Sequence, residues 1–123
     1  MTRVLVDTSV WIDHLKQTEP DLVRLLNQGL ASTHPFVEGE LACGSLRNRE
    51  EIIQLLSGLP MLAKADDEEM LQFISVHQLY GKGLGLVDLH LLAACCIERC
   101  TIWTRDRRLR GVAEVMKVAS PLV

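Results

Sequence analysis

The sequence has 123 residues, a length that suits one domain with a single core and is too short for two ordinary domains. Hydrophobic residues make up 48% of it but aromatic residues only 4%, so we expect an ordered chain whose core is built mainly from aliphatic side chains. The net charge of -3 argues against nucleic-acid binding by bulk positive potential alone, so any RNA contact must be local.

Apolar stretches and cysteines indicate where the protein is found. Charged residues interrupt every apolar stretch well before the about 18 to 20 residues of a membrane span, and the N-terminus lacks a basic region followed by a long apolar core. We therefore expect a cytoplasmic protein. Cys95, Cys96 and Cys100 lie close together on one predicted helix, where neighbours are poorly placed for disulfides, so we expect reduced thiols.

The first half of the chain alternates short apolar runs with amphipathic helical patterns. Its first run ends at Asp7-Thr8-Ser9, polar capping residues that precede a helical pattern. Pro20 and Pro35 are typical helix starts, and Gly29 and Gly58 are typical helix ends. The helices predicted here cover residues 10–15, 20–26, 35–42 and 50–56, and the strands cover residues 3–6, 30–33 and 61–63.

The second half begins with an acidic run at residues 66–69, which is favourable at the start of a long helix that we expect to reach Tyr80. A glycine-rich loop at residues 81–85 lacks the order of a phosphate-binding loop. The elements predicted after it are a buried helix over 87–99, a strand over 101–104, a short helix over 106–112 and a final strand over 115–118. Strands that alternate with helices predict an α/β fold with a parallel sheet covered on both faces.

Two aspartates follow predicted strands. Asp7 comes directly after an apolar run, and Asp106 follows another with Arg105 between. Ligands of open parallel sheets collect beyond the carboxyl ends of the strands, and adjacent strands would bring the two aspartates together. Glu40 and Asp88 lie in mainly apolar helical segments, a costly setting for an ion unless a cation or hydrogen bonds compensate. Such carboxylates suit Mg²⁺ or Mn²⁺, which activate water for attack on a phosphodiester.

Each of these acids also has a structural alternative. Asp7, Asp88 and Asp106 each precede or begin a predicted helix and could serve only as its cap. Glu40 has no capping role in mid-helix but could simply face solvent. Glu38 competes with Glu40, yet two residues along a helix place it on a different face.

Four segments of the chain resemble the PIN-domain family, and most closely the VapC-type toxins of bacterial toxin and antitoxin pairs. The segments are residues 4–12, 40–44, 88–93 and 104–109. The resemblance implies a single PIN domain over residues 1–123, folded as a three-layer α/β/α sandwich around a central parallel sheet. It further implies an Mg²⁺- or Mn²⁺-dependent endoribonuclease, formation of a homodimer, and inhibition by a cognate VapB-type antitoxin.

The resemblance also assigns site residues. The proposed catalytic and metal ligands are Asp7, Glu40, Asp88 and Asp106. Ser9 and Thr104 are candidates for polar support. Some relatives have a further acid soon after the last aspartate, where this chain has Arg107, Arg108 and Leu109, so one metal ion and two remain alternatives.

Two surfaces are candidates for contacts with partners. A basic patch adjoins Asp106 and could hold RNA phosphates, the alternative being a solvated helix face. Its members are Arg105, Arg107, Arg108 and Arg110. Trp11, Ile12 and Leu15 are candidates for an exposed apolar groove that takes an antitoxin helix.

Two other functions are compatible with parts of this pattern. A catalytically silent PIN-fold module would keep the fold only to bind a partner, but retention of all four acids weighs against it. A receiver-like phosphoacceptor domain would need paired acids after the first strand, an aspartate after the third and a lysine after the fifth. Only Asp7 fits that arrangement naturally.

Overall fold

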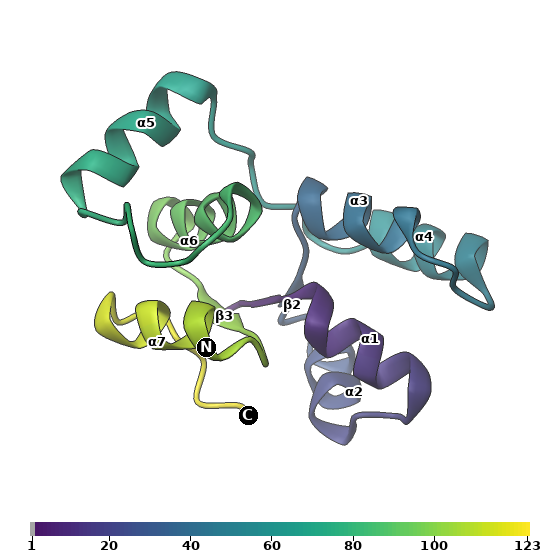
Figure 1. Ribbon diagram of the computed structural model, residues 1–123. Coiled ribbons are helices and arrows are strands. Elements are labelled where there is room, and N and C mark those ends of the chain that lie inside the picture. Colours follow the sequence, from purple (N-terminus) through teal and green to yellow (C-terminus); the bar gives the residue numbers. More distant parts are fainter. Residues whose placement is uncertain (1) are drawn as a thin grey trace.

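A parallel sheet lies at the centre of the computed structural model, which describes residues 2–123 (Figure 1). Its strands are β1 (Val4–Val6), β2 (Ala31–Ser32) and β3 (Thr101–Trp103). The strand order is β2-β1-β3, and both pairings are parallel. Val4 pairs with Ala31 on one side and with Thr101 on the other, so β1 is the central strand. The carboxyl ends of β1 and β3 therefore lie side by side.

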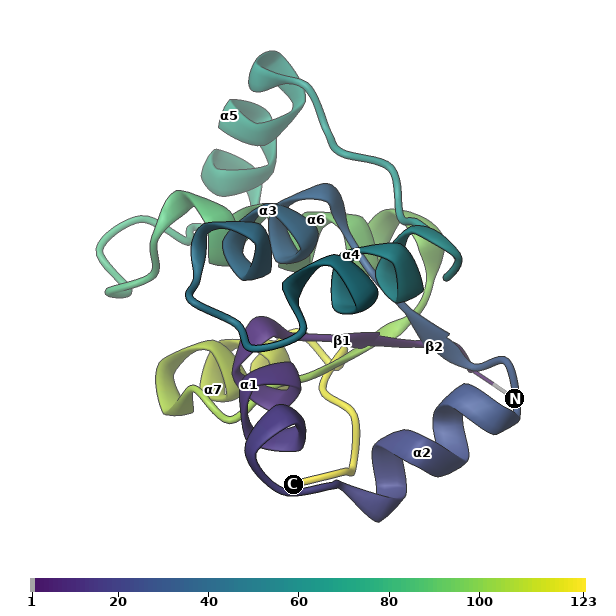
Figure 2. The same cartoon turned by 90° about the vertical axis from the view of Figure 1, so that its right-hand side faces the viewer.

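Helices cover both faces of this sheet, which confirms the predicted three-layer α/β/α fold. In Figure 2, α3, α4 and α6 lie above the strands with α5 beyond them, and α1, α2 and α7 lie below. The helices are α1 (Thr8–Lys16), α2 (Pro20–Asn27), α3 (Pro35–Cys43), α4 (Arg49–Ser57), α5 (Asp67–Val76), α6 (Leu86–Glu98) and α7 (Arg107–Val115). Within residues 2–123, none of them combines the length and apolar character needed to cross a membrane.

Two predicted elements are shorter in the structure than the sequence indicates. The predicted strand over 61–63 is reduced to one bridge between Met61 and Thr33. The predicted helix toward Tyr80 ends at Val76, because Gln78 adopts a left-handed conformation with φ 52°, which cannot continue a helix. The acidic start of that helix is a capping box in which Asp66 and Glu69 bond each other's backbone N–H.

The predicted strand over 115–118 is wrong. Helix α7 runs on to Val115, and the chain then turns at Lys117, whose φ is 62°. Leu109, Ala113 and Met116 recur at helical spacing and pack on the core, which outweighs the strand preference of the valines. After this turn, Ala119 forms a single parallel bridge with Ile102 of β3, in which the backbones of Val118 and Ser120 are hydrogen-bonded to Ile102.

The aliphatic core fixes the sheet between the helix layers. Leu5 and Val6 of β1 are completely buried, and residues 89–95 of α6 form an unbroken buried run over the sheet. Full burial of one such aliphatic side chain contributes about 1.5–3 kcal/mol relative to exposure. This packing holds the ends of β1 and β3 in register, and the polar residues after them are positioned by the same core.

Candidate active site

Asp7 lies at the carboxyl end of β1 and is 6% exposed. It occupies the position before α1, but its side chain makes no capping hydrogen bond to that helix. Instead, Oδ2 accepts hydrogen bonds from the hydroxyls of Ser9 and Thr104, each 2.7 Å long. Capping therefore does not explain this buried carboxylate.

The two hydroxyls also join the junctions that follow β1 and β3. Thr104 Oγ1 accepts from the backbone N–H of Asp106 at 3.1 Å, and Ser9 Oγ accepts from that of Arg105 at 3.0 Å. Because each hydroxyl oxygen accepts a backbone N–H, its own proton is free to point at Asp7. The orientation of the Asp7 carboxylate is thus set by both junctions together.

Asp106 takes the same position before α7 and does cap its helix. Its Oδ1 accepts from the backbone N–H of Leu109 at 3.0 Å. The side chain is exposed, in contrast to that of Asp7. A carboxylate has two acceptor oxygens, so the cap leaves one oxygen of Asp106 for another ligand.

Glu40 projects from α3 toward the start of α1. It is exposed, yet its Oε1 accepts a 2.7 Å hydrogen bond from the hydroxyl of Thr8. Thr8 was identified from the sequence only as a capping residue, and its bond to Glu40 could not be seen there. Glu38 is half-buried, and its Oε2 lacks a hydrogen-bond partner within residues 2–123.

Asp88 lies in the first turn of α6 and responds to the other three acids. Its pKa is raised from the ordinary value, first by burial and then by the negative charges of Asp7, Asp106 and Glu40, against a lowering hydrogen bond from the Gly85 backbone. Glu38 is not among these charges. The other three predicted acids therefore lie within electrostatic reach of Asp88.

The donor set fits a hard divalent cation. Mg²⁺ and Mn²⁺ prefer carboxylate oxygens, and a cation would relieve the repulsion that the raised pKa of Asp88 reports. Within residues 2–123, no three acidic, histidine or cysteine side chains already converge at metal-ligand spacing.

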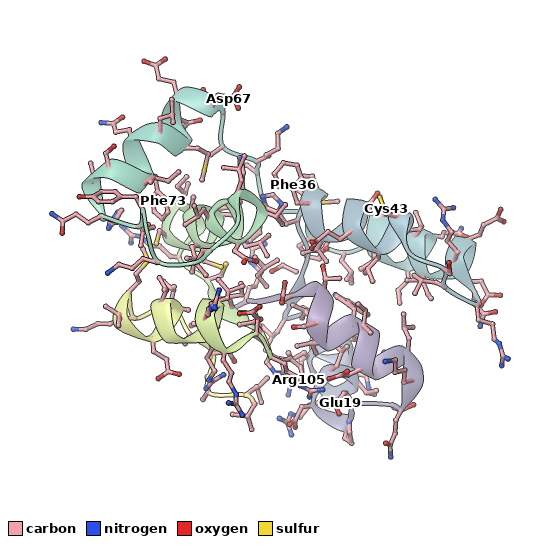
Figure 3. All side chains as sticks on the ribbon, in the orientation of Figure 1. Glu19, Phe36, Cys43, Asp67, Phe73 and Arg105 are labelled. Carbon is pink, nitrogen blue, oxygen red and sulfur yellow. The ribbon has the colours of Figure 1, made fainter. Side chains whose placement is uncertain are left out.

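The arginines after β3 have different surroundings. Arg105 pairs with Asp13 at 2.8 Å and with Glu19, and its guanidinium lies 5.6 Å from the centre of the Trp103 ring (Figure 3). These carboxylates raise the pKa of Arg105. Arg105 thus ties the β3–α7 junction to α1 and α2. Arg107 and Arg108 are exposed and line a cavity of about 450 Å³ beside α7.

The predicted apolar groove on α1 needs one correction. Trp11 is 1% exposed and belongs to the core, so its place in an exposed strip was wrong. A tryptophan next to Val10 packs inward here because that face of α1 covers the sheet. Ile12 and Leu15 are each 39% exposed and are accessible to a partner.

A second hollow of about 480 Å³ adjoins Glu40 on α3. Phe36 and Cys43, both labelled on α3 in Figure 3, line it together with Gly39 and Val87. Cys43 and the three cysteines near the end of α6 are free thiols. The hollow leaves apolar surface directly beside one of the acids.

Fold and site together define a PIN domain: residues 4–115 match the PIN domain family, and the chain belongs to it. It is 39% identical over 117 residues to Ribonuclease VapC32 of Mycobacterium tuberculosis, in strains CDC 1551 / Oshkosh and ATCC 25618 / H37Rv, with 94% of each chain covered. The predicted family, of the VapC type, is confirmed. The crystal structure of PAE2754 from Pyrobaculum aerophilum shares the fold, with a TM-score of 0.60 and 14% identity over 89% of this chain and 78% of that one.

Proposed function

We propose that this chain is an endoribonuclease of the VapC type that hydrolyses RNA phosphodiester bonds with Mg²⁺ or Mn²⁺. The observation that carries the proposal is the position of Asp7 and Asp106 directly after the neighbouring strands β1 and β3. Asp88 lies close enough that burial, and then the charges of Asp7, Asp106 and Glu40, raise its pKa. The 39% identity to Ribonuclease VapC32 supports the same activity.

Asp7 and Asp106 are the principal metal ligands in this proposal, and Glu40 and Asp88 complete the site directly or through water. A bound cation supplies an activated water and stabilises charge on the phosphodiester. The hydroxyls on Asp7 hold its carboxylate in one orientation, and Thr8 does the same for Glu40. Such supporting hydrogen bonds position ligands and tune their affinity.

RNA phosphates are proposed to contact Arg107 and Arg108. Both are exposed in the first turn of α7, directly after Asp106. Arg105 also belongs to the basic patch predicted from the sequence, but its guanidinium is engaged by Asp13 and Glu19. We therefore assign Arg105 to the scaffold of the site.

The partners follow from the family and from the accessible apolar surface. We propose that a VapB-type antitoxin lays an amphipathic helix on Ile12 and Leu15, and that the protein forms a homodimer in the cytoplasm. The free cysteines are consistent with that reducing compartment.

A cleavage assay on total cellular RNA tests the proposed activity. The purified protein should cut RNA in Mg²⁺ or Mn²⁺ and not in excess chelator, and mapping of the new ends should define the site of cleavage. Asp7→Asn should abolish cleavage, whereas Asp21→Asn, at a surface ion pair of α2 with Arg24, is the matched control and should retain it. Equal cleavage in chelator would exclude the metal mechanism, and RNA binding without cleavage would favour a silent module.

A further inference from the structure

A cavity lies between α7 and the segment that leads from α5 to α6. In Figure 1 this connection runs between α6 and α7. The cavity has a volume of about 450 Å³. The residues that line it are His77, Gln78, Leu79, Lys82, Arg107, Arg108, Gly111, Val112, Val115 and Met116.

Three cations at this cavity lack ion-pair partners. Within residues 2–123, Lys82, Arg107 and Arg108 form no ion pair with a carboxylate. The basic residues that do form ion pairs are Arg24, Arg105 and Arg110, and none of these lines the cavity. In a chain with a net charge of -3, a local group of unpaired cations selects an anionic ligand.

The inner surface of the cavity is apolar. Leu79 is buried, Val112 and Met116 are half-buried, and Val115 at the outer end is 83% exposed. Apolar side chains can hold the flat face of an unstacked nucleobase, and the neighbouring cations suit its phosphate. A base that is paired and stacked in a duplex cannot enter such a cavity.

Gly111 keeps the cavity open from the middle of α7. Its backbone has no left-handed conformation, and a Cβ at this position would meet nothing within 4 Å. Neither backbone strain nor close packing therefore requires glycine here, although glycine weakens a helix interior relative to alanine. A larger side chain at Gly111 would project into the cavity and fill it.

The cavity begins next to the acids. Arg107 and Arg108 belong to the first turn of α7, which Asp106 caps. Arg108 also packs closely on Gly83, which follows Leu79 and Lys82 in the facing segment, since a Cβ at Gly83 would lie 3.0 Å from Arg108 Nη1. The loop that contains Gly83 continues into α6, whose first turn carries Asp88. A strand of RNA with its cleaved bond at the acids therefore has this cavity as a neighbouring position.

We infer that the cavity binds an unpaired nucleotide of single-stranded RNA next to the cleaved bond. Its base lies against Val112 and Met116, and its phosphate lies against Lys82, Arg107 and Arg108. The inference rests on the proposed ribonuclease function and adds a requirement to it, since the substrate must offer a base that is free to leave its stack.

Filling the cavity tests the inference. Gly111→Leu places an aliphatic side chain in it, whereas Gly111→Ala strengthens the helix and leaves most of the space. Binding is measured by fluorescence anisotropy with a labelled mixed-sequence single-stranded RNA, in Ca²⁺, which also takes carboxylate ligands. Gly111→Leu should weaken binding about tenfold and Gly111→Ala at most about twofold, because the burial of the base against apolar side chains is lost only when the cavity is filled. A duplex of the same sequence should bind both variants as it binds the parent.

Lys82→Gln tests the cationic wall without a change in any helix, and it serves if Gly111→Leu fails to fold. Loss of one phosphate contact should reduce the slope of log affinity against log salt by about one. Lys16→Gln, on the exposed end of α1, is the matched control and should leave the slope unchanged.

The outcomes separate this inference from the proposed activity. In one outcome, the parent cleaves RNA in Mn²⁺ while Gly111→Leu and Gly111→Ala bind and cleave RNA equally. In that case the cavity is not a nucleotide site, and the proposed activity stands. If the parent fails to cleave but Gly111→Leu loses single-strand binding, the nucleotide site stands and the activity fails. A change in molecular mass of Gly111→Leu by light scattering, with unchanged RNA binding, would assign the cavity to a second copy of the chain and overturn the inference.

Discussion

The junctions β1–α1 and β3–α7 are built from the same sequence parts, yet their aspartates are used differently. Asp7 is buried, leaves the start of α1 uncapped, and accepts two hydroxyl hydrogen bonds. Asp106 is exposed and accepts the backbone N–H of Leu109 in the first turn of α7. An aspartate before a helix is therefore not always its cap, and nearby hydroxyls decide which role it takes.

The two aspartates also differ in what they contribute to the stability of the fold. A capping side chain typically contributes about 0.5–2 kcal/mol, which is sufficient reason for Asp106 to be present. Burial of the Asp7 carboxylate costs free energy, and the hydroxyls of Ser9 and Thr104 offset only part of that cost. The folded state gains little from Asp7, so a ligand is the stronger explanation for it.

Asp7→Asn should have the largest effect on cleavage. The amide keeps the size of the side chain but removes the buried negative charge, so RNA cleavage in Mn²⁺ should fall by about 100-fold or more. The same variant should lower the raised pKa of Asp88, because the charge of Asp7 is the largest charge effect on that group after burial. Initial rates and an NMR titration measure the two effects. Parent-like values of both would show that Asp7 lies outside the site.

Asp106→Asn should separate the metal role from the cap. Asparagine caps helices about as well as aspartate, so the unfolding free energy of the metal-free protein should change little, whereas Asp106→Ala should lose about 1 kcal/mol. Both variants should cleave RNA at least about tenfold more slowly, and both should gain less stability from Mn²⁺ than the parent. If Asp106→Asn cleaves RNA at the parent's rate while Asp106→Ala is destabilised, Asp106 serves only as a helix cap.

Much of the fold could be predicted because its signals are local. Apolar runs before Asp7 and Asp106, prolines at helix starts and an acidic capping box each identify an element within a few residues. The errors came where a local pattern fits two structures. Valines at 115 and 118 are compatible with a strand, whereas the helical spacing of the core-facing residues before them and the packing of α7 on β3 favour a helix.

The sequence predicts which acids belong to the candidate site, but it does not predict the hydrogen bonds around them. The order of the four acids indicated which residues gather, and the pKa of Asp88 responds to the other three. The bond from Thr8 to Glu40 spans 32 positions, and the one from Thr104 to Asp7 spans 97, so no local pattern contains them. The burial of Trp11 likewise depends on which face of α1 meets the sheet.

At a third junction, β2–α3, the residue that caps the helix is a titratable histidine, His34. The ring of His34 is fully buried, and its Nδ1 accepts from the backbone N–H of Phe36. Burial, and then the charges of His90 and Lys64, lower the pKa of His34 from 6.5 to about 4. His34 therefore binds a proton more readily in the unfolded chain than in the folded protein. Its contribution to the unfolding free energy is complete above pH 6.5 and is lost as the pH falls toward about 4.

His34→Asn should remove this pH dependence. Asparagine also caps helices but does not titrate in this range. Between about pH 7 and about pH 5, the parent should lose roughly 2 kcal/mol of unfolding free energy more than the variant does. Denaturant unfolding of both proteins at each pH gives that difference. Parallel loss in the two proteins would show that His34 is not held neutral by the fold.

Thr104→Val should have the smallest effect, and it tests the link between the first two junctions. Valine has nearly the shape of this buried threonine, but it removes the donor to Asp7 Oδ2 and the acceptor of the Asp106 N–H. Two polar groups lose a partner, so the unfolding free energy should fall by about 1 kcal/mol. Ser9→Ala is the matched variant: it removes the other hydroxyl from Asp7 and the acceptor of the Arg105 N–H, and it leaves the Asp106 N–H bonded to Thr104. If these hydroxyls orient Asp7 for a metal, each variant should weaken Mn²⁺ binding about tenfold, measured as the Mn²⁺ dependence of Tm. If Thr104→Val lowers the unfolding free energy but leaves the Mn²⁺ dependence of Tm as in the parent, Thr104 only joins the two junctions and does not orient a metal ligand.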